Sequence, residues 1–537
     1  MTMGNTDGQL NLRIAYNSLT SQQATMVWSR PEQAVDHFTL QWGGQPAVQV
    51  ANNRYYYELT KLTATTKYTV TLTAYLQNGR QLQATQEFKT LAKGKVLDVS
   101  QAPYNLSSGQ TVQTVNLQRA IDDCPDGGTV LIPQGLSIIS GALDLHSHMT
   151  LQVDGQLIAS TDPFDYIRNP QKDRSQGIDL DDLIWTRYEG WEMKCFRSLI
   201  NVGHLDREQR STMTCRDVRI CGQGIIRGGG SQLGDAMESY FTDTKRYPQY
   251  ISDNITGRRV RGRLINVIQT DGIDLQDVQL QNPPCWTLHL IYSQHITVDS
   301  VHINSVGIDN GDGIDPDSCS HVLIFGATFD TGDDCIAIKS GKNPEGNQVA
   351  IPTSDVEIFN LQMLGGHGMA IGTEESAGVS HVIVHDCLIH DTDFGIELKA
   401  SNERGGGVDD FTVDHCQIDS FFAHSVNYNA DGQAAKELPV FKRLKLTNSR
   451  ITGNTHQKDV MGNPIDAFGK AIEVIGFKDH DVASPITDLL IQNVSLAHGS
   501  SLCSFDRCAD VCLDHVTVEH GQLNLQVGPD TQGFRIN

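Results

Sequence analysis

A short strand-like element recurs nine times between residues 272 and 518, and this repeat limits the chain to few folds. Each copy has nine residues with apolar side chains at alternating positions, and successive copies begin 22 to 45 residues apart. A minimum of about 22 residues with variable additions is typical of a right-handed parallel β-helix, because one coil cannot bury its apolar face alone and insertions leave as loops. A period of 3.6 residues is nearly absent, which excludes a helical solenoid. The copies are GIDLQDVQL (272–280), HITVDSVHI (295–303), HVLIFGATF (321–329), DVEIFNLQM (355–363), HVIVHDCLI (381–389), DFTVDHCQI (410–418), RLKLTNSRI (443–451), DLLIQNVSL (488–496) and DVCLDHVTV (510–518).

The first 92 residues show a different all-β pattern. Apolar and polar residues alternate over 24–28, 37–42 and 68–76, and polar, turn-rich segments separate these stretches. Tyr68 follows a turn that starts at Leu62, and a tyrosine so placed can bond through its hydroxyl to upstream backbone, as in the tyrosine corner of Ig-like sandwiches. This part resembles a fibronectin type III domain, with an unrelated seven-stranded sandwich as the alternative.

We therefore expect an all-β chain with two parts. A small fibronectin type III-like β-sandwich would occupy residues 1–92, and a parallel β-helix would occupy residues 96–537. One helix is expected, over 114–124, where an apolar pattern ends at two glycines. This helix would cap the open end of the solenoid, where unpaired backbone invites aggregation.

The chain is acidic, with 64 Asp and Glu against 41 Lys and Arg and a formal net charge of −23. Such a charge argues against broad binding to nucleic acids or anionic membranes. No stretch reaches about 18 apolar residues, and the first residues lack the pattern of a signal peptide. We expect a cytoplasmic location, or a periplasmic or secreted one if a leader was removed. The 12 cysteines lack zinc-finger spacing and are expected to be buried free thiols, which suits a reducing compartment.

Acidic residues are densest in two segments, 310–319 and 330–339. Asp312 and Asp333 are 21 residues apart, close to one coil. Since neighbouring coils lie about 4.8 Å apart, Asp312, Asp333 and Asp334 should form one patch. Carboxylates that close cannot all ionise cheaply, and a protonated acid beside ionised partners is what glycoside hydrolysis needs. A solvated acidic edge and a calcium loop are the alternatives, although the run does not match the EF-hand ligand pattern.

Four short motifs follow one another in the second half of the chain. They are Asn310-Gly-Asp312, Gly332-Asp333-Asp334, Gly366-His367-Gly368 and, with one departure, Glu397-Leu-Lys399. From about residue 96 onward the chain thereby resembles glycoside hydrolase family 28, the polygalacturonase family, and its front part resembles the layout of bacterial exo-acting members. The resemblance implies an inverting hydrolase that cleaves α-1,4-linked galacturonic acid in pectic chains or oligogalacturonates, with exo action.

The resemblance also implies a role for each motif residue. Asp333 would be the general acid that protonates the leaving oxygen, and Asp312 and Asp334 would hold and activate the attacking water. His367 would tune the proton of the acid and contact the substrate. Asn310 would position the substrate or the Asp312 side chain. Attack by water from the opposite face inverts the anomeric configuration.

The fourth motif departs from the family pattern, in which an arginine stands at the position of Glu397. Lys399 is retained, but a glutamate offers only acceptors where an arginine offers a planar fork for a carboxylate. We expect Arg404, nearby in the sequence, to supply the missing cation; the alternative is a subsite for a sugar without a carboxylate. Glu374 is expected to bind sugar hydroxyls, with a solvated loop as the alternative.

The expected partner is a pectic polysaccharide or oligogalacturonide, without nucleic acid or membrane, and the oligomeric state stays open. No cofactor and no metal are expected, because no cluster has both ligand spacing and an open position. The basic segment 245–263 is either a loop that closes one end of the site, as exo action needs, or a solvated loop. Two other functions stay open: a relative that cuts a modified linkage such as rhamnogalacturonan, and a non-catalytic carbohydrate-binding β-helix.

Overall fold

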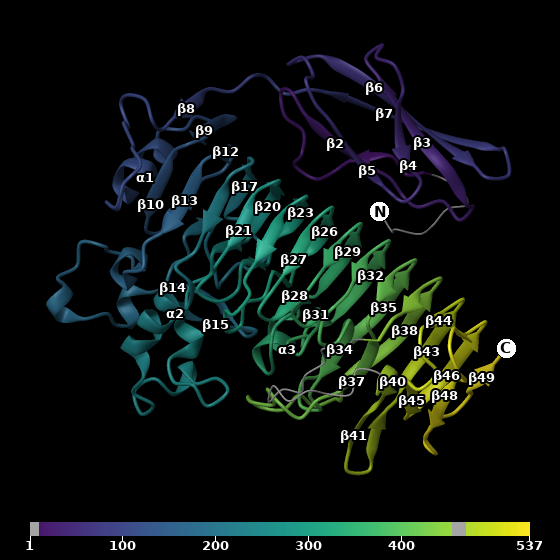
Figure 1. Ribbon diagram of the computed structural model, residues 1–537. Helices are drawn as coiled ribbons and strands as arrows, with labels where there is room; N and C mark the ends of the chain where they lie inside the picture. Colours follow the sequence, from purple (N-terminus) through teal and green to yellow (C-terminus); the bar gives the residue numbers. More distant parts are fainter. Residues whose placement is uncertain (1–9, 454–468) are drawn as a thin grey trace.

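The computed structural model describes residues 10–453 and 469–537, and these are nearly all β (Figure 1). Three long parallel sheets of 12, 12 and 14 strands run side by side along the chain. Successive coils add one strand to each sheet, as the labels from β8 to β49 in Figure 1 show. The predicted parallel β-helix, preceded by a small β-sandwich, is confirmed.

We call one sheet the site sheet, because it carries the predicted catalytic residues, and a second one the docking sheet, because the sandwich packs on it. The site sheet has twelve strands, in the order β11 (Leu143–Leu145), β16 (Ile200–Val202), β19 (Ile265–Ile268), β22 (Leu288–Ile291), β25 (Ile314–Asp317), β28 (Asp334–Ile338), β31 (Gly368–Ile371), β34 (Ile396–Ala400), β37 (Phe421–Ser425), β40 (Lys470–Ile475), β45 (Leu502–Asp506) and β48 (Asn524–Val527). The docking sheet has fourteen, in the order β8 (Val96–Asp98), β9 (Gly128–Ile132), β12 (Met149–Val153), β17 (Cys215–Cys221), β20 (Thr270–Gln276), β23 (Gln294–Asp299), β26 (Ser320–Phe325), β29 (Thr353–Phe359), β32 (Val379–His385), β35 (Gly407–Asp414), β38 (Val440–Thr447), β43 (Ile486–Gln492), β46 (Cys508–Asp514) and β49 (Arg535–Ile536). The third sheet has β10 (Ser137–Ser140), β13 (Gln156–Ala159), β18 (Ile225–Arg227), β21 (Gln279–Gln281), β24 (His302–Asn304), β27 (Thr328–Asp330), β30 (Gln362–Met363), β33 (Leu388–Ile389), β36 (Gln417–Ile418), β39 (Arg450–Ile451), β44 (Ser495–Leu496) and β47 (Thr517–Val518).

Each nine-residue element forms a strand of the docking sheet, a sharp corner and a strand of the third sheet. In HITVDSVHI, for example, β23 ends at Asp299 and β24 begins at His302, and Ser300 between them has a φ of 55°. The sixth residue of all nine copies has a φ between 48° and 68°. Eight of these nine residues are Gly, Asn, Asp or His, the types that adopt the left-handed region most readily. The corner is therefore encoded once per coil.

The second residue of every copy points into the helix and forms one continuous apolar column. Parallel pairing places these residues side by side from one coil to the next. None is more than 2% exposed, so each contributes roughly 1.5–3 kcal/mol by burial. The column is Ile273, Ile296, Val322, Val356, Val382, Phe411, Leu444, Leu489 and Val511.

A helix lies at the first coil, where one was predicted over 114–124. It is α1 (Thr114–Asp122), which buries Leu117 and Ile121, and Gln118 donates from its side-chain amide to the carbonyl of Asp144 in β11 at 2.9 Å. The other α-helices are α2 (Gly230–Glu238) and α3 (Glu345–Val349). Over the residues that the structure describes, none of the helices has the length and apolarity needed to cross a bilayer.

From residue 10 onward, where the structure describes it, the N-terminal sandwich has seven strands, and a β-hairpin of the β-helix projects near the site. The sandwich strands are β1 (Arg13–Ile14), β2 (Ala24–Val27), β3 (Val35–Trp42), β4 (Val48–Ala51), β5 (Tyr56–Leu59), β6 (Lys67–Leu76) and β7 (Gln81–Lys89), and the hairpin is β14 (Ile184–Tyr188) with β15 (Trp191–Cys195). The backbone amide of Thr63 donates to the hydroxyl of Tyr68 at 2.9 Å, which confirms the tyrosine corner. The division at residues 92–96 stays a prediction.

The sandwich packs on the outer face of the docking sheet (Figure 1). The ring of Tyr56 lies 4.9 Å from that of Phe325, which belongs to the apolar cluster of the sandwich. Arg30 pairs with Asp386 at 2.6 Å across the contact. A mixed apolar and ionic interface of this kind holds the two parts together as one body.

A group of buried carboxyl groups lies in this interface. Asp299 accepts a hydrogen bond from the hydroxyl of Thr25 at 3.4 Å, and Asp274 pairs with Arg219 at 2.8 Å. Burial raises the pKa of Asp299 to about 8 and that of Asp274 to about 7, and neighbouring acidic groups add to both. Arg219 opposes the shift only at Asp274.

These shifts predict a pH-dependent stability. Because the folded pKa of Asp299 lies above that of the unfolded chain, the stability that its proton provides is complete below about pH 4 and is lost as the pH rises toward 8. Asp299→Asn mimics the protonated form. We expect its free energy of unfolding, relative to the unmodified chain, to rise by about 3–4 kcal/mol between pH 5 and pH 8 in urea titrations. Asp510→Asn, at an exposed position in β46 with a φ of 56°, serves as the control, and equal pH slopes for both variants would contradict the prediction.

The cysteines are free thiols, as predicted. Ten of the twelve are buried, and the other two, Cys221 and Cys512, are partly exposed. Burial raises the pKa of several of them, to about 12 at Cys319, so these thiols act as small apolar side chains.

Candidate active site

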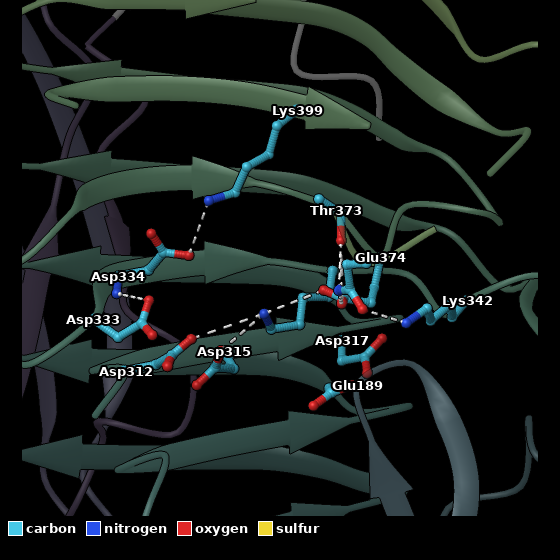
Figure 2. Close-up of polar contacts among 12 residues, drawn as sticks. Glu189, Asp312, Asp315, Asp317, Asp333, Asp334, Lys342, Thr373, Glu374 and Lys399 are labelled. Atoms are coloured by element: carbon cyan, nitrogen blue, oxygen red, sulfur yellow. Dashed lines mark hydrogen bonds and ion pairs between the residues drawn. The ribbon is translucent and has the colours of Figure 1, made fainter. Parts of the chain in front are cut away.

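The motif residues come from adjacent coils of the site sheet. Asp312 lies just before β25, Asp333 and Asp334 lie at the start of β28, His367 lies just before β31, and Lys399 lies in β34. These four strands pair in that order, so residues separated by a whole coil in sequence become neighbours. Figure 2 shows the three aspartates grouped at the ends of two neighbouring strands, with Lys399 reaching toward Asp334. The structure thus brings together the predicted catalytic set.

Two of the aspartates hold protons more tightly than a free carboxyl group. Asp312 is 3% exposed and Asp334 is 5% exposed. Burial, followed by the charges of Asp315 and Asp333, raises the pKa of Asp312 well above its usual range. Burial also raises the pKa of Asp334, although Lys399 opposes the shift. Closely spaced carboxyl groups that do not all ionise are what the sequence predicts.

The third aspartate behaves in the opposite way because of its histidine partner. Nδ1 of His367 lies 3.0 Å from Oδ1 of Asp333. Although burial opposes charge on both groups, this contact raises the pKa of His367 to about 9 and holds that of Asp333 far below its usual value. In the free site the proton therefore resides on His367, whereas the acid role of Asp333 leads one to expect it on the aspartate. That role stays a prediction, and it requires the proton to cross this 3.0 Å contact.

Two central residues are missing from the sequence-based set. Nζ of Lys339 lies 3.5 Å from Asp315, 3.5 Å from Glu374 and 3.9 Å from Asp312. Burial raises the pKa of Asp315 to about 7, with Lys339 opposing. Both residues stand in the two dense acidic segments, and alternate residues of a strand share a face. Asp315 lies in β25 and Lys339 directly follows β28, so alternation along these two strands is the signal that could have found them.

The basic segment folds onto the site. Arg258 and Arg261 donate to the side-chain oxygen of Asn310 at 2.8 Å and 2.7 Å. Arg259 pairs with Asp431 at 2.7 Å, and all three arginines are at most 6% exposed. The alternative of a solvated loop is wrong for these residues. Asn310 is held by arginines, and its contact with substrate stays a prediction.

Glu374 lies inside the site and is ionised. It is 4% exposed, and its side chain accepts a hydrogen bond from Asn429 at 2.6 Å. Although burial opposes ionisation, the cations around Glu374, Lys339 first among them, lower its pKa to about 2. Figure 2 shows Glu374 between Thr373 and Lys342. The alternative of a solvated loop is wrong here too, because Glu375 next to it is 0% exposed.

Arg404 does not reach the surface of the site, and the expectation for it needs correction. Its side chain is 0% exposed. Nε donates to the carbonyl of Thr373 at 2.5 Å, one terminal nitrogen donates to Asn343, and the other donates to the carbonyl of Asn429 at 2.7 Å. These donors are used inside the fold, so Arg404 organises the loops behind Glu374 instead of replacing the family arginine.

One group of side chains in the described ranges has the geometry to hold a metal ion. Asp333, Asp334 and His367 place one ligand atom each within 4.8 Å of the others. These are the predicted catalytic residues, and His367 already carries a proton against Asp333. A carboxylate pair performs glycoside hydrolysis without a metal, so the arrangement suits acid–base chemistry.

Comparisons with known proteins agree with this geometry. The profile described as Glycosyl hydrolases family 28 matches residues 209–461, and that of the Fibronectin type III domain matches residues 10–90. The chain is 24% identical over 478 residues to the exo-poly-alpha-D-galacturonosidase of Dickeya chrysanthemi, covering 83% of this chain and 74% of that relative. It is 28% identical over 319 residues to a probable polygalacturonase of Vitis vinifera, covering 57% of this chain and 58% of the relative.

The fold is also that of a solved structure, the family 28 exopolygalacturonase of Yersinia enterocolitica. The two share a TM-score of 0.80 with 20% identity, over 98% of this chain and 99% of the other. The match spans both the sandwich and the β-helix, and the residues that the family profile matches include all four motifs of this chain. Over residues 209–461 the β-helix therefore matches the Glycosyl hydrolases family 28, and over residues 10–90 the N-terminal sandwich matches the Fibronectin type III domain.

Proposed function

We propose that the protein hydrolyses α-1,4-linked galacturonic acid in pectic chains or oligogalacturonates, from a chain end and with inversion. The observation that carries this is the grouping of Asp312, Asp333 and Asp334 with His367 on adjacent coils. The raised pKa values of Asp312 and Asp334 make either one a stronger base once it is ionised, and Asp333 shares a proton with His367, so the site holds both an acid and an acceptor for a water proton. The relatives named as galacturonan hydrolases support the substrate class.

In the proposed mechanism the aspartates divide the work of an inverting glycosidase. Asp312 and Asp334 orient a water molecule, and the one of the two that is ionised takes its proton as it attacks the anomeric carbon. His367 first passes its proton from Nδ1 to Asp333 across their 3.0 Å contact, and Asp333 then delivers this proton to the leaving oxygen. Lys399, 3.7 Å from Asp334, stabilises that carboxyl group in its charged form as it begins to act as a base.

The exo mode is supported by a loop that bridges the site. Residues 426–439 join β37 to β38 and reach back to the basic segment, where Asp431 pairs with Arg259 at 2.7 Å and also with Lys342. Asn343 donates to the carbonyl of Gln433 at 2.8 Å. A site spanned by such a bridge suits the end of a chain better than its interior.

Product analysis tests the proposal. The protein is incubated with polygalacturonate and, in parallel, with rhamnogalacturonan, and the products are identified by mass. We expect saturated monomers or dimers from polygalacturonate. Products with a 4,5-unsaturated end would show a lyase and overturn the carboxylate assignment, and early release of long oligomers would overturn the exo mode.

The bridge makes a further prediction about product length. Asp431→Ala leaves Arg259 and Lys342 without this carboxylate and loosens the loop. We expect the fraction of products longer than dimers to rise at least threefold by mass analysis of early digests. Asp479→Ala, in the exposed hairpin β41 (Phe477–Asp479) and β42 (Val482–Ser484), is the control, and an unchanged distribution for both variants would contradict the prediction.

Activity is expected to be independent of metal ions. The carboxylates and His367 supply the proton transfers, so turnover measured as reducing ends released should change by less than about a factor of two in excess EDTA. A loss of activity that calcium restores would contradict this.

A cytoplasmic location stays a prediction, and the twelve free thiols support it.

A further inference from the structure

Charged side chains of alternating sign form a row that leads away from the predicted catalytic residues. Nζ of Lys399 lies 3.7 Å from Asp334 and 2.9 Å from Glu397. His424 lies between two carboxylates, with Nε2 2.8 Å from Glu397 and Nδ1 2.8 Å from Glu473. The row is Asp334, Lys399, Glu397, His424, Glu473 and Lys470, the last two being paired as well.

The row follows from the register of the site sheet. Parallel pairing of β34 with β37 and of β37 with β40 places Glu397, Phe422 and Glu473 in one column and Lys399 beside His424 in the next. Alternate residues of these strands point inward, so the charged ones share the outer face. Glu397 is thereby fixed between the predicted catalytic coil and its C-terminal neighbours.

The positive groups nearest the predicted catalytic residues are already neutralised. Lys399 has a carboxylate on either side, and so has His424. Burial opposes ionisation of both groups. Even so, Lys399 and then His424 lower the pKa of Glu397 to about 2, and Glu397 and Glu473 raise the pKa of His424 to about 9. A substrate carboxylate placed here would lie beside the carboxylates of Glu397 and Glu473. Among the described side chains of this row, no cation is left unpaired to bind it.

Aromatic rings complete the surroundings. The ring of Phe394 lies 5.6 Å from that of His367 and 6.5 Å from that of Phe422, and Phe422 lies 5.7 Å from His424. Carboxylates accept hydrogen bonds from sugar hydroxyls, and aromatic faces pack against the C–H face of a sugar ring. This is the chemistry of a subsite for an uncharged sugar.

We propose that Glu397, His424 and Glu473, with Phe394 and Phe422, form a subsite for a sugar unit that has no ionised carboxylate, and that Glu397 is the residue that discriminates against a uronate there. The proposal rests on the proposed hydrolysis of pectic chains and makes it more specific. A chain with a neutral sugar beside galacturonate is the better substrate, and free polygalacturonate is cut more slowly.

Three disaccharides test this. They are digalacturonate, galacturonyl-galactose and galactosyl-galacturonate, so the neutral unit occupies either side of the scissile bond. We expect kcat/KM for one mixed disaccharide to exceed that for digalacturonate at least tenfold. Glu397→Gln removes the repelling charge and should reduce this ratio about tenfold. Glu519→Gln, in an exposed pair with Arg450, is the matched control and should leave the ratio unchanged.

The outcomes separate the two proposals. A preference of the unmodified chain for digalacturonate, or an unchanged ratio in folded Glu397→Gln, overturns the subsite while the hydrolase stands. If Glu397→Gln does not fold, Glu473→Gln, on the other side of His424, provides the same comparison. If none of the three disaccharides is hydrolysed, the proposed function fails for them. The subsite is then judged by calorimetric binding to Asp312→Asn, where tighter binding of digalacturonate than of both mixed disaccharides overturns it.

Discussion

Asp333→Asn is expected to lower kcat on trigalacturonate about 10²–10⁴-fold with the fold intact, the range typical of a general acid. An amide cannot pass a proton to the leaving oxygen, and it cannot accept one from His367 at 3.0 Å. The loss should appear in kcat more than in KM, because the proton moves only in the transition state. Initial rates from reducing ends, with circular dichroism on the same samples, give the result.

Asp391→Asn provides the matched control for this variant. Asp391 is exposed, lies at a corner with a φ of 58° that asparagine tolerates, and sits in the coil next to the site. Its activity should stay within a factor of two. Activity of Asp333→Asn within threefold of the unmodified chain would remove Asp333 from the acid role and would turn attention to Asp312, whose raised pKa also makes it a proton carrier.

The fold could be predicted from the sequence because the repeat specifies it twice. An apolar residue at the second position of each element builds the inner column, and a left-handed corner at the sixth position turns the chain into the next sheet. Both signals are local and recur in all nine copies. What the repeat does not specify is the docking of the sandwich, since contacts such as Arg30 with Asp386 join residues 356 apart.

The site could be predicted only where motifs mark it. Asp312, Asp333, Asp334 and His367 lie at the ends of strands in short motifs, and the coil spacing brings them together. Burial of a loop residue has no such signal. Arg404 is placed by the sequence near the missing arginine, but three backbone or side-chain acceptors hold it inside the fold.

The position of the proton is also beyond the sequence. Three neighbouring aspartates predict that at least one stays protonated, but which one depends on single contacts. His367 at 3.0 Å lowers the pKa of Asp333, whereas Asp315 and Asp333 add to the burial that raises the pKa of Asp312. A difference of about 1 Å in one such contact changes the order in which the groups ionise.

The second large effect is expected in stability, at the buried ion pair of Arg187 and Asp317. Arg187 lies in β14 and Asp317 in β25, both side chains are 0% exposed, and the two meet at 2.9 Å. The same guanidinium donates to Ser318 at 2.9 Å and to the carbonyl of Gly190 at 3.1 Å. Burial opposes ionisation of Asp317, but Arg187 lowers the pKa of this group, so the carboxylate is charged in the interior.

Arg187→Met removes the cation and leaves that carboxylate uncompensated, so we expect the free energy of unfolding to fall by about 3–5 kcal/mol. Arg216→Met, which breaks an exposed pair with Asp271 at 2.8 Å, should cost at most about 1 kcal/mol. The double variant Arg187→Met/Asp317→Leu should recover part of the loss, because replacing both partners with apolar groups removes the buried charge itself. Urea titrations of the three variants decide the matter. A loss for Arg187→Met no larger than that for Arg216→Met would mean that Asp317 takes up a proton instead, with His289 at 3.5 Å and the backbone amide of Gly341 at 3.0 Å as remaining partners.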